Sequence, residues 1–550
     1  MKQKFIKFTA LMIAVLMAMS LFAGCVVKDS SKDNTTPKSE SAKDNKAANE
    51  EKDKYQPIDG KVYEITYLTM TNAPVNEDSY IGRKFNEMFN VKLKPVFVES
   101  SKWDDLLNIR LSSGDIPDVF PSKSSDRFLR YQHGELIQEL PIEVINKYAP
   151  DMLKAISRDD PKSWSVCTFE GKNYGIPYLV ANYMIRDAIV WRDDWLRNVG
   201  IEKIPDTITE WEEALIKFRN DDPDKNGNKD TYGCSGTIIG PVFGAYGAMI
   251  DMWWNTFWLE KDGKIVNSAI EPGTKEALKL LSRWYGMDLI DPEFVAGENK
   301  GGYWAVSTDF VNSKIGVSTM GSAYHWQKEG NGLVGGANYN EMKKINPDAT
   351  YEFGNPPLGP DGKSRGTTKL PLSTGASYVF SKNVEPDKLG RILQMFNWPM
   401  ADYKNYIFNR YGEEGIHHIV TKEAGYDVYN IAEPYKSDPA RATGEVGYAA
   451  FFWQADVNNT RKINGAYFDN FLKKGFDRYG IEDMGYKLYI PSGATFATDL
   501  HSLMQETYIN IITGKKPIES FDEFVEKWKK NGGDQMLKEA NDHYAKTKSN

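Results

Sequence analysis

The chain has 550 residues, of which 41% are hydrophobic and 26% charged, so it is too rich in apolar side chains to be disordered. At roughly 150 residues per domain, this length predicts about two to four structural units. The 76 acidic side chains outnumber the 68 basic ones and leave a formal charge of −8, which excludes a nucleic-acid partner, because phosphates require a basic surface. Aromatic residues make up 13%, and flat rings suit sugar faces as well as hydrophobic cores.

The first residues are typical of an export signal. Three lysines among the first seven residues precede an almost wholly apolar run over 8–23, and small residues stand just before Cys25. Because the run is shorter than the roughly 18 to 20 residues that span a bilayer, cleavage before Cys25 is favoured over a permanent transmembrane anchor. The pattern resembles a bacterial lipobox, which implies a lipid such as palmitate on Cys25 and a protein held at the extracellular face of the cell membrane.

The segment after Cys25 is a predicted tether. Residues 28–53 contain no aromatic and no large aliphatic side chain, so they cannot bury enough surface to offset the entropy of ordering. Cys167 and Cys234 are the two remaining cysteines. We expect both to be reduced and buried, with a disulfide between them as the alternative.

The folded part opens with alternating strand and helix patterns. A β-rich run at 62–68 precedes apolar residues at helical spacing from Ile81 to Phe89, and a second strand follows at 91–98. Another amphipathic helix runs from Trp103 to Leu111, before a short buried strand at 118–120. The alternation predicts an α/β fold with a parallel sheet covered on both faces.

The loop after the third strand is a candidate ligand site. Ligands of such sheets bind beyond the carboxyl ends of the strands, which places Ser122, Ser125 and Asp126 near a crevice. A solvated surface loop is the alternative for each of these residues. Further along, the pattern S/T-x-x-E at Thr209–Glu212 and at Ser520–Glu523 predicts two capped helix starts, and Gly532-Gly533 ends the second helix.

The sharpest chemical motif is an oxygen-rich loop that begins at Asp222. Oxygen side chains recur at its positions 1, 3, 5 and 9, and Gly227 at position 6 allows a sharp turn, as in a calcium-binding loop. Position 12 departs from an EF-hand, because Gly233 stands where a bidentate Glu would be. The alternative is a surface loop rich in Asx turns. The predicted ligands are Asp222, Asp224, Asn226, Asn228 and Asp230.

Two other motifs do not support a function. Gly362-Lys363-Ser364 imitates the end of a phosphate-binding loop, but the glycine expected five residues earlier is Pro357, which argues against ATP binding. His417 and His418 are adjacent and point apart, so they do not form an i, i+4 metal pair. We expect packing roles for both, and no G-x-S-x-G elbow supports a catalytic serine.

Several segments, taken in order, resemble one family. They are SGDIPDVF (113–120), YGIPY (174–178), WRDDWLRNVGI (191–201), TITEWEEALIKF (207–218), YGEEGIHH (411–418) and FDEFVEKWKKNGGDQM (521–536). These segments resemble the extracellular solute-binding proteins of bacterial ABC transporters, and more narrowly the oligosaccharide and alginate receptors. The resemblance spans nearly the whole chain after Cys25, and the calcium-like loop is similar to a structural calcium site of the alginate-receptor branch.

The resemblance implies two α/β lobes joined by a multi-segment hinge that close over a ligand. We expect the chain to cross between lobes near 181–190, near 377–381 and again beyond Tyr411. The predicted organisation is a signal peptide (1–24), a tether (25–57), an N-lobe (58–183 and 376–420) and a C-lobe (184–375 and 421–550).

Ligand binding is assigned to aromatic rings near the expected cleft, because a pyranose offers an apolar face for stacking and a rim of hydroxyls. Trp326 and Trp453 are the first choices, since each follows a run of small residues suited to a loop. Core packing is the alternative for each ring taken singly. The predicted ligand-binding residues are Trp326, Trp453, Trp253, Trp254, Trp304, Asp126 and Tyr183.

Three functions are compatible with these observations. The favoured one is a monomeric, lipid-anchored receptor that binds an oligosaccharide without chemistry and hands it to an ABC permease driven by a separate ATPase. The alternatives are a lipoprotein glycoside hydrolase or lyase, with a carboxylate of raised pKa in its cleft, and a receptor of the same fold for peptides.

Overall fold

The structure is a computed structural model, and residues 53–550 form one compact unit in it. It describes residues 53–68, 74–98, 103–180, 188–301, 304–326, 336–364, 366, 368–369, 373, 375–423, 426–435, 454–463 and 481–548. The predicted leader, Cys25 and nearly all of the predicted tether lie outside these residues.

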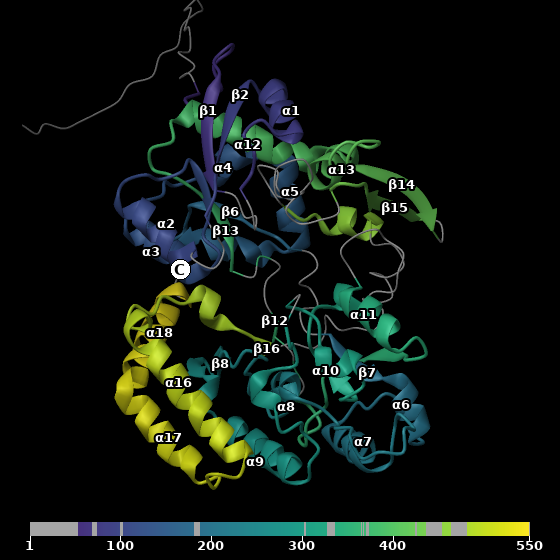
Figure 1. Cartoon of the computed structure of the whole chain (residues 1–550). Coiled ribbons are helices and arrows are strands. Elements are labelled where there is room, and N and C mark those ends of the chain that lie inside the picture. Colours follow the sequence, from purple (N-terminus) through teal and green to yellow (C-terminus); the bar gives the residue numbers. More distant parts are fainter. Residues whose placement is uncertain are drawn as a thin grey trace, which may run out of the picture. The chain divides into compact units, whose positions relative to one another are not determined.

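A five-stranded sheet organises the first lobe, in the order β2-β1-β3-β13-β6 (Figure 1). The strands are β1 (Tyr63–Leu68), β2 (Val91–Val96), β3 (Val119–Pro121), β6 (Gly175–Pro177) and β13 (Ser377–Phe380). β1 runs parallel to β2 with Tyr63 opposite Val91, and parallel to β3. The expected all-parallel sheet is only partly correct, because β13 is antiparallel to both β3 and β6.

Helices cover both faces of this sheet, as predicted. Since side chains alternate along a strand, Tyr378 and Phe380 enter one core cluster while Val379 enters the other. Ser79 caps α1 by accepting a hydrogen bond from Gly82 N, and Asn90 ends it in the left-handed conformation. The helices are α1 (Tyr80–Phe89), α4 (Ile142–Tyr148), α5 (Pro150–Asp159) and α12 (Pro386–Ala401) on one face, and α2 (Trp103–Ser112) and α3 (Ser125–His133) on the other.

The hairpin of β14 (His418–Glu423) and β15 (Tyr426–Ile431) packs on α13 (Tyr403–Tyr411), and Tyr411 stacks on Tyr429 with ring centroids 5.1 Å apart (Figure 1). Downstream, Gln454 accepts a hydrogen bond from Leu179 N in the first lobe. These contacts join residues 421–463, where described, to elements of the first lobe, whereas the prediction assigns residues from 421 onward to the C-lobe. The spacing of apolar residues locates a hairpin but not the lobe on which it packs.

A second set of elements builds the other lobe around a three-stranded antiparallel sheet, β10-β7-β11, and a β8–β9 hairpin. Its strands are β7 (Ile189–Arg192), β8 (Trp258–Lys261), β9 (Lys264–Asn267), β10 (Val317–Ser318) and β11 (Tyr351–Gly354). Its helices are α6 (Asp193–Asn198), α7 (Ile208–Asn220), α8 (Ile239–Ala245), α9 (Pro272–Gly286), α10 (Thr308–Val311), α11 (Ala337–Ile345), α16 (Gly493–Ile512), α17 (Ser520–Trp528) and α18 (Asp534–Lys548).

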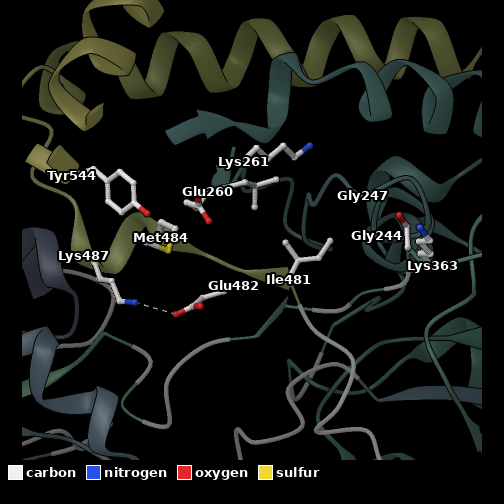
Figure 2. Close-up of a pocket in the computed structure, with 12 residues that line it drawn as sticks. Gly244, Gly247, Glu260, Lys261, Lys363, Ile481, Glu482, Met484, Lys487 and Tyr544 are labelled. Atoms are coloured by element: carbon white, nitrogen blue, oxygen red, sulfur yellow. Dashed lines mark hydrogen bonds and ion pairs between the residues drawn. The ribbon is translucent and has the colours of Figure 1, made fainter. Parts of the chain in front are cut away.

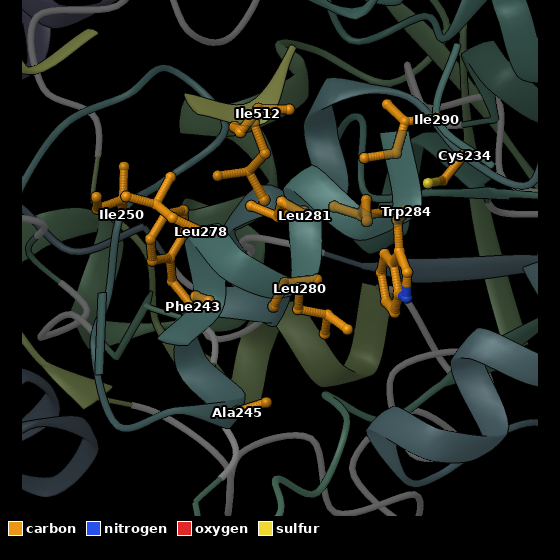
Figure 3. Close-up of a cluster of buried hydrophobic side chains, with 14 of the residues drawn as sticks. Cys234, Phe243, Ala245, Ile250, Leu278, Leu280, Leu281, Trp284, Ile290 and Ile512 are labelled. Atoms are coloured by element: carbon orange, nitrogen blue, oxygen red, sulfur yellow. The ribbon is translucent and has the colours of Figure 1, made fainter. Parts of the chain in front are cut away.

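The largest hydrophobic cluster lies in this second lobe. Figure 3 shows Leu278 of α9 beside Phe243 of α8 and Leu281 of α9 beside Ile512 of α16, and Trp284 of α9 belongs to the same cluster. Cys234 is buried in the same cluster, and Cys167 is buried in the first lobe; neither forms a disulfide, as expected. The C-terminal helices therefore complete a core whose other half is contributed more than 200 residues earlier, since Tyr508 donates a hydrogen bond to the Ala269 carbonyl over a separation of 239 residues.

Two helix starts differ from prediction. A capping box begins α7, but its cap is Thr207 with Glu210, two residues before the predicted pair. At α17 the cap position is Glu519 and no side chain caps the helix, so the predicted role of Ser520 is wrong. The chain bends after Trp528 as predicted, through non-helical Gly532, before α18 continues.

Short strands complete the chain: β4 (Thr168–Phe169) pairs with β5 (Lys172–Asn173), and β12 (Thr368–Lys369) runs parallel to β16 (Ile481–Glu482). Strand membership changes from the first to the second sheet between β6 and β7, and back between β11 and β13. Among the described residues, no helix has both the length and the apolar character required to cross a membrane.

Candidate functional site

A cluster of serines, named here the serine cluster, lies where β3 ends and β13 begins. It consists of Ser122, Ser125, Ser373 and Ser377, all buried. The hydroxyls of Ser122 and Ser377 lie 2.9 Å apart, and Ser377 N donates to Ser122 Oγ. The buried Oγ atoms of Ser125 and Ser373 have no hydrogen-bond partner among the described residues.

Ser122 and Ser125 come from the loop after β3, where the sequence predicts candidate ligand residues. Ser124 caps α3 by accepting from Arg127 N, which places Ser125 and Asp126 in its first turn. The side chain of Asp126 is outside the described part of the structure, and Tyr183 lies wholly outside it. Their ligand-binding roles therefore stay predictions.

One turn connects the serine cluster to a pocket. The 3-10 turn η11 (Met484–Lys487) packs against α3 of the first lobe, and a Cβ on Gly375 would lie 3.3 Å from Ser125 Oγ and 3.8 Å from Tyr486 Cβ. Two other residues of the same turn, Met484 and Lys487, line the pocket. Gly375 therefore lies beside both Ser125 and Tyr486 of this turn, while Met484 and Lys487 of the same turn line the pocket.

The pocket has a volume of about 480 Å³ and lies among β8, β16, η11, α18 and the turn at 361–364. Figure 2 shows Tyr544 and Glu260 on one side, with Ile481 and the Glu482–Lys487 ion pair across from them. The size is within the usual range for small-molecule sites of about 300–1,000 Å³. Polar atoms form most of its exposed lining, which suits a hydrophilic ligand.

Hydrogen bonds fix the charged groups around η11. Lys487 Nζ lies 3.1 Å and the Tyr486 hydroxyl 2.7 Å from Glu482 Oε1. Burial raises the pKa of Glu482, but the hydrogen bonds from Tyr486 and Lys487 outweigh it, so the net direction is downward. Asp483 is half-buried and accepts from Trp258 N and Gly485 N; burial nevertheless raises its pKa to about 6.

The phosphate-loop mimic noted in the sequence is an Asp-capped turn beside this pocket. Asp361 accepts hydrogen bonds from Lys363 N, Ser364 N and Ser364 Oγ, and these bonds hold the pKa of Asp361 down to about 2. Lys363 and Ser364 therefore enter the pocket lining through a rigid turn.

Two of the predicted tryptophans are exposed, as a stacking surface requires. Trp253 is 49% and Trp304 is 45% exposed. The backbone around Trp253 is held by Asp251, whose carboxylate accepts from Trp253 N at 2.9 Å. Trp304 packs edge-on against His325, with ring centroids 5.2 Å apart. Trp254 is buried in the main core of the second lobe, which supports the packing alternative for that ring.

The structure also favours packing for Trp326, one of the two first choices. Its ring is fully buried between Phe310 and Tyr351, and its Nε1 donates to the Met320 carbonyl at 3.0 Å. A ring without an open face offers no stacking surface, so we remove Trp326 from the proposed ligand set. The small residues before it allow close packing rather than a ligand loop. Trp453 lies outside the described residues, and its role stays a prediction.

The calcium-like loop brings its acidic side chains together. Asn226 Nδ2 lies 3.0 Å from Asp224 Oδ2 and 3.3 Å from both carboxylate oxygens of Asp230, while Gly227 N donates to Asp222 Oδ2. Burial and the neighbouring carboxylates raise the pKa of Asp224. No group of three or more His, Cys, Asp or Glu side chains in the described part of the chain is arranged as a metal site. For Asn228, the backbone N donates to Asn226 Oδ1.

Sequence reasoning did not identify Tyr486, Lys487 and Tyr544 as site residues. They stand in segments with no recognisable motif. Tyr486 and Lys487 contact Glu482 four and five residues earlier, whereas Tyr544 joins the pocket lining from the distant helix α18. The one local signal is Asp483-Met484-Gly485, where an Asx turn precedes a glycine.

The sequence matches a described protein family and two curated bacterial proteins. Residues 71–401 match the family described as bacterial extracellular solute-binding protein. Lipoprotein LipO of Bacillus subtilis is 25% identical over 480 residues, which cover 83% of this chain and 87% of LipO. The polygalacturonan/rhamnogalacturonan-binding protein YtcQ of the same organism is 24% identical over 494 residues, which cover 85% of this chain and 88% of YtcQ.

A solved structure shares the fold. The alginate-binding protein AlgQ2, described as without calcium ion, superposes with a TM-score of 0.61 at 18% identity and covers 90% of this chain and 100% of its own. The matched family segment contains the serine cluster, both exposed tryptophans and the oxygen-rich loop. The chain belongs to the bacterial extracellular solute-binding protein family.

Proposed function

We propose that this protein is the receptor of an ABC importer, which binds an oligosaccharide and delivers it to permease subunits driven by a separate ATPase. The observation that carries the proposal is the polar pocket, which is lined in part by Met484 and Lys487 of η11. Hydroxyls at Ser125 and Ser373, carboxylates at Glu260 and Glu482, and nearby donors suit the hydroxyl rim of a sugar. YtcQ and AlgQ2, both named for polysaccharide binding, support this substrate class.

The proposed mechanism involves no bond chemistry. Ligand contacts made by both lobes only in a closed state would drive closure, because a ligand shifts a conformational equilibrium only through its differential affinity for the two states. Exposed rings at Trp253 and Trp304 would stack on the apolar face of a sugar ring, and the serine cluster would receive hydroxyls from the other side.

We further propose that the mature protein is monomeric and lipid-anchored at Cys25, on the extracellular face of the cell membrane. The small residues before Cys25 and the polar tether after it support this, as does the lipoprotein description of LipO. A polar tether would let the folded lobes reorient while they stay near the permease.

Calcium is proposed as a structural ion of the loop at 222–230. The side-chain oxygens of Asp222, Asp224, Asn226 and Asp230 fit an oxygen-loving cation. Its charge would stabilise the ionised form of Asp224, whose pKa is raised by burial and by the neighbouring carboxylates. A Cβ at Gly233 would lie 2.7 Å from Leu215 Cβ, so position 12 has no room for a side-chain ligand. The loop would therefore hold calcium with fewer carboxylates than an EF-hand. Asn228 would contribute through its backbone carbonyl or side chain.

A glycan panel tests the sugar proposal. Full-length protein is screened by thermal shift against neutral and acidic oligosaccharides and against peptides, since a ligand that binds only the folded form raises the Tm. For the best glycan, Trp253→Ala and Trp304→Ala should each weaken binding by about 1–3 kcal/mol, because each removes a stacking ring. Met287→Ala, which removes another exposed apolar side chain of the second lobe, serves as the control.

The outcomes separate the three functions. An intact glycan recovered from a stoichiometric complex supports the receptor, and turnover of the glycan would support a hydrolase or lyase instead. A Tm rise with peptides and none with glycans would overturn the sugar proposal.

Calcium binding is tested separately by titration calorimetry and by the Tm with and without chelator. Removing calcium should lower the Tm of the unaltered protein, and combining Asp224→Ala with Asp230→Ala should abolish that response. A titration without heat of binding would contradict the assignment.

A further inference from the structure

A second pocket lies within the second lobe and shares no lining residue with the first pocket. It has a volume of about 420 Å³ and is enclosed by the segment leading into β8, the end of β9, and helices α16, α17 and α18. Trp258, His501 and Trp528 supply aromatic rings to its lining, and Met504 contributes an apolar surface.

The lining of this pocket excludes a charged ligand. None of its residues is Asp, Glu, Lys or Arg, and His501 is the one titratable side chain among them. In a chain with 26% charged residues, a pocket of this size without a fixed charge is unusual, and an ionic ligand would find no counter-ion in it. The pocket therefore suits a neutral ligand.

The side-chain amides of Asn255 and Asn267 line the pocket, and their hydrogen-bond partners determine which atom is the oxygen and which the nitrogen. Asn255 Nδ2 donates to Asp251 Oδ2 at 3.0 Å, and Asp251 also accepts from Asn255 N, so the Asn255 side chain keeps Oδ1 as an acceptor. Asn267 Oδ1 accepts from Ala269 N at 3.0 Å, which leaves Nδ2 as its donor. A carboxylate cannot donate and an N–H cannot accept, so neither assignment can be reversed. The pocket thus presents one fixed acceptor and one fixed donor.

Local packing also holds the rings in place. Trp258 is half-buried, and its backbone N donates to Asp483. One face of Trp528 is closed by Gly533, because a Cβ there would lie 2.2 Å from the indole. Trp258 lines the pocket and is only half-buried, so we assign stacking on a flat apolar face to this ring.

From this combination we infer that the pocket is a second carbohydrate site for one neutral hexopyranosyl unit. The apolar face of the sugar stacks on Trp258, and vicinal hydroxyls donate to Asn255 Oδ1 and accept from Asn267 Nδ2. Because all its residues belong to one lobe, the site binds without lobe closure. It does not depend on the oligosaccharide site proposed above.

A blocking variant tests the site without disturbing its core. Ala497 is an exposed residue of α16 in the pocket lining, so Ala497→Phe should obstruct the pocket. Ala494→Phe is the matched control, since Ala494 is also exposed on α16 and does not line the pocket. Trp258→Ala is the second test variant. Full-length protein is titrated with methyl glucoside, methyl galactoside and methyl mannoside and with neutral disaccharides and tetrasaccharides, followed by ligand-observed saturation-transfer NMR and calorimetry.

The proposal expects saturable binding of at least one neutral glycoside, weakened at least tenfold by Ala497→Phe and by Trp258→Ala but unchanged by Ala494→Phe. Binding of tetrasaccharides tighter than methyl glycosides would identify the unit as part of a longer glycan, and equal binding would identify a free sugar. Equal affinity in Ala497→Phe and unaltered protein overturns the proposal, as does the absence of binding by every neutral glycoside. If Ala497→Phe removes all glycan binding, the second-pocket proposal is supported and the first-pocket proposal is overturned. If Ala497→Phe removes no glycan binding, the second-pocket proposal is overturned and the first-pocket proposal is retained.

Discussion

Glu298 gives the sharpest pH-dependent prediction, because it is a carboxylate enclosed in the second lobe. It is fully buried and accepts hydrogen bonds from three hydroxyls: Thr237 Oγ1 at 2.5 Å, Ser307 Oγ at 2.6 Å and Ser318 Oγ at 2.5 Å. Burial raises its pKa from 4.5 to about 7, and the three hydroxyl donors only partly oppose this rise.

The sign follows from linkage. Folding favours the protonated form of Glu298, so its contribution to stability is fully present below pH 4.5 and is lost as the pH rises to about 7. At about 1.4 kcal/mol for each pH unit, the loss amounts to about 3 kcal/mol in the free energy of unfolding. Glu298→Gln keeps the shape but cannot ionise. The substitution should lower the free energy of unfolding by about 1 kcal/mol at pH 4.5, because one hydrogen bond is mismatched. As the pH rises, the stability of the variant should increase relative to that of the unaltered protein.

Urea denaturation at several pH values between 4.5 and 8, followed by tryptophan fluorescence, measures this difference. The gap between Glu298→Gln and unaltered protein should change by about 3 kcal/mol over that range. Glu260→Gln, a change at an exposed carboxylate of the same lobe, is the control and should run parallel to the unaltered protein. Parallel profiles for Glu298→Gln as well would refute the argument that burial raises the pKa of Glu298 in the folded lobe.

Three further predictions address the core, a close contact and the anchor. Trp326→Ala should lower the free energy of unfolding by about 3–5 kcal/mol without weakening glycan binding in the folded fraction, and a stable variant with lost binding would return Trp326 to the ligand set. Gly359→Ala places a Cβ 1.7 Å from the Ala245 carbonyl oxygen and should lower the free energy of unfolding, measured by urea denaturation, by about 1–3 kcal/mol. Gly286→Ala, whose Cβ would meet open space, is the control and should not lower it. Cys25→Ala should release the protein from the membrane fraction or leave it unprocessed; if this variant is cleaved and retained as before, lipidation at Cys25 is disproved.

Local sequence signals located individual elements well. The spacing of Ile81 and Phe85 predicted α1, and the β-rich run at 62–68 predicted β1, because burial of one helix face or of alternate strand residues repeats over a few positions. The same reasoning misplaced the cap of α7 by two residues. Thr207 and Thr209 are both capping residue types, and the choice between them depends on Leu358, whose carbonyl accepts from Ile208 N and fixes where the helix starts.

The serine cluster shows what a local pattern cannot supply. The sequence placed Ser122 and Ser125 after a strand, but Ser377 joins them across a separation of 255 residues. That pairing depends on β13 lying antiparallel beside β3, a register decided by the assembly of the whole sheet.

The sequence alone determined the alternation of strands and helices, the burial of both described cysteines, the oxygen-rich loop and a resemblance strong enough to name a family. These features are encoded in residue type and short spacing. The tertiary structure decided which rings are open to a ligand: Trp253 and Trp304 are exposed, while Trp326 is enclosed by Phe310 and Tyr351. Exposure depends on which distant segments cover a side chain. The residues next to a tryptophan in the sequence can be of the same types whether its indole is buried or exposed.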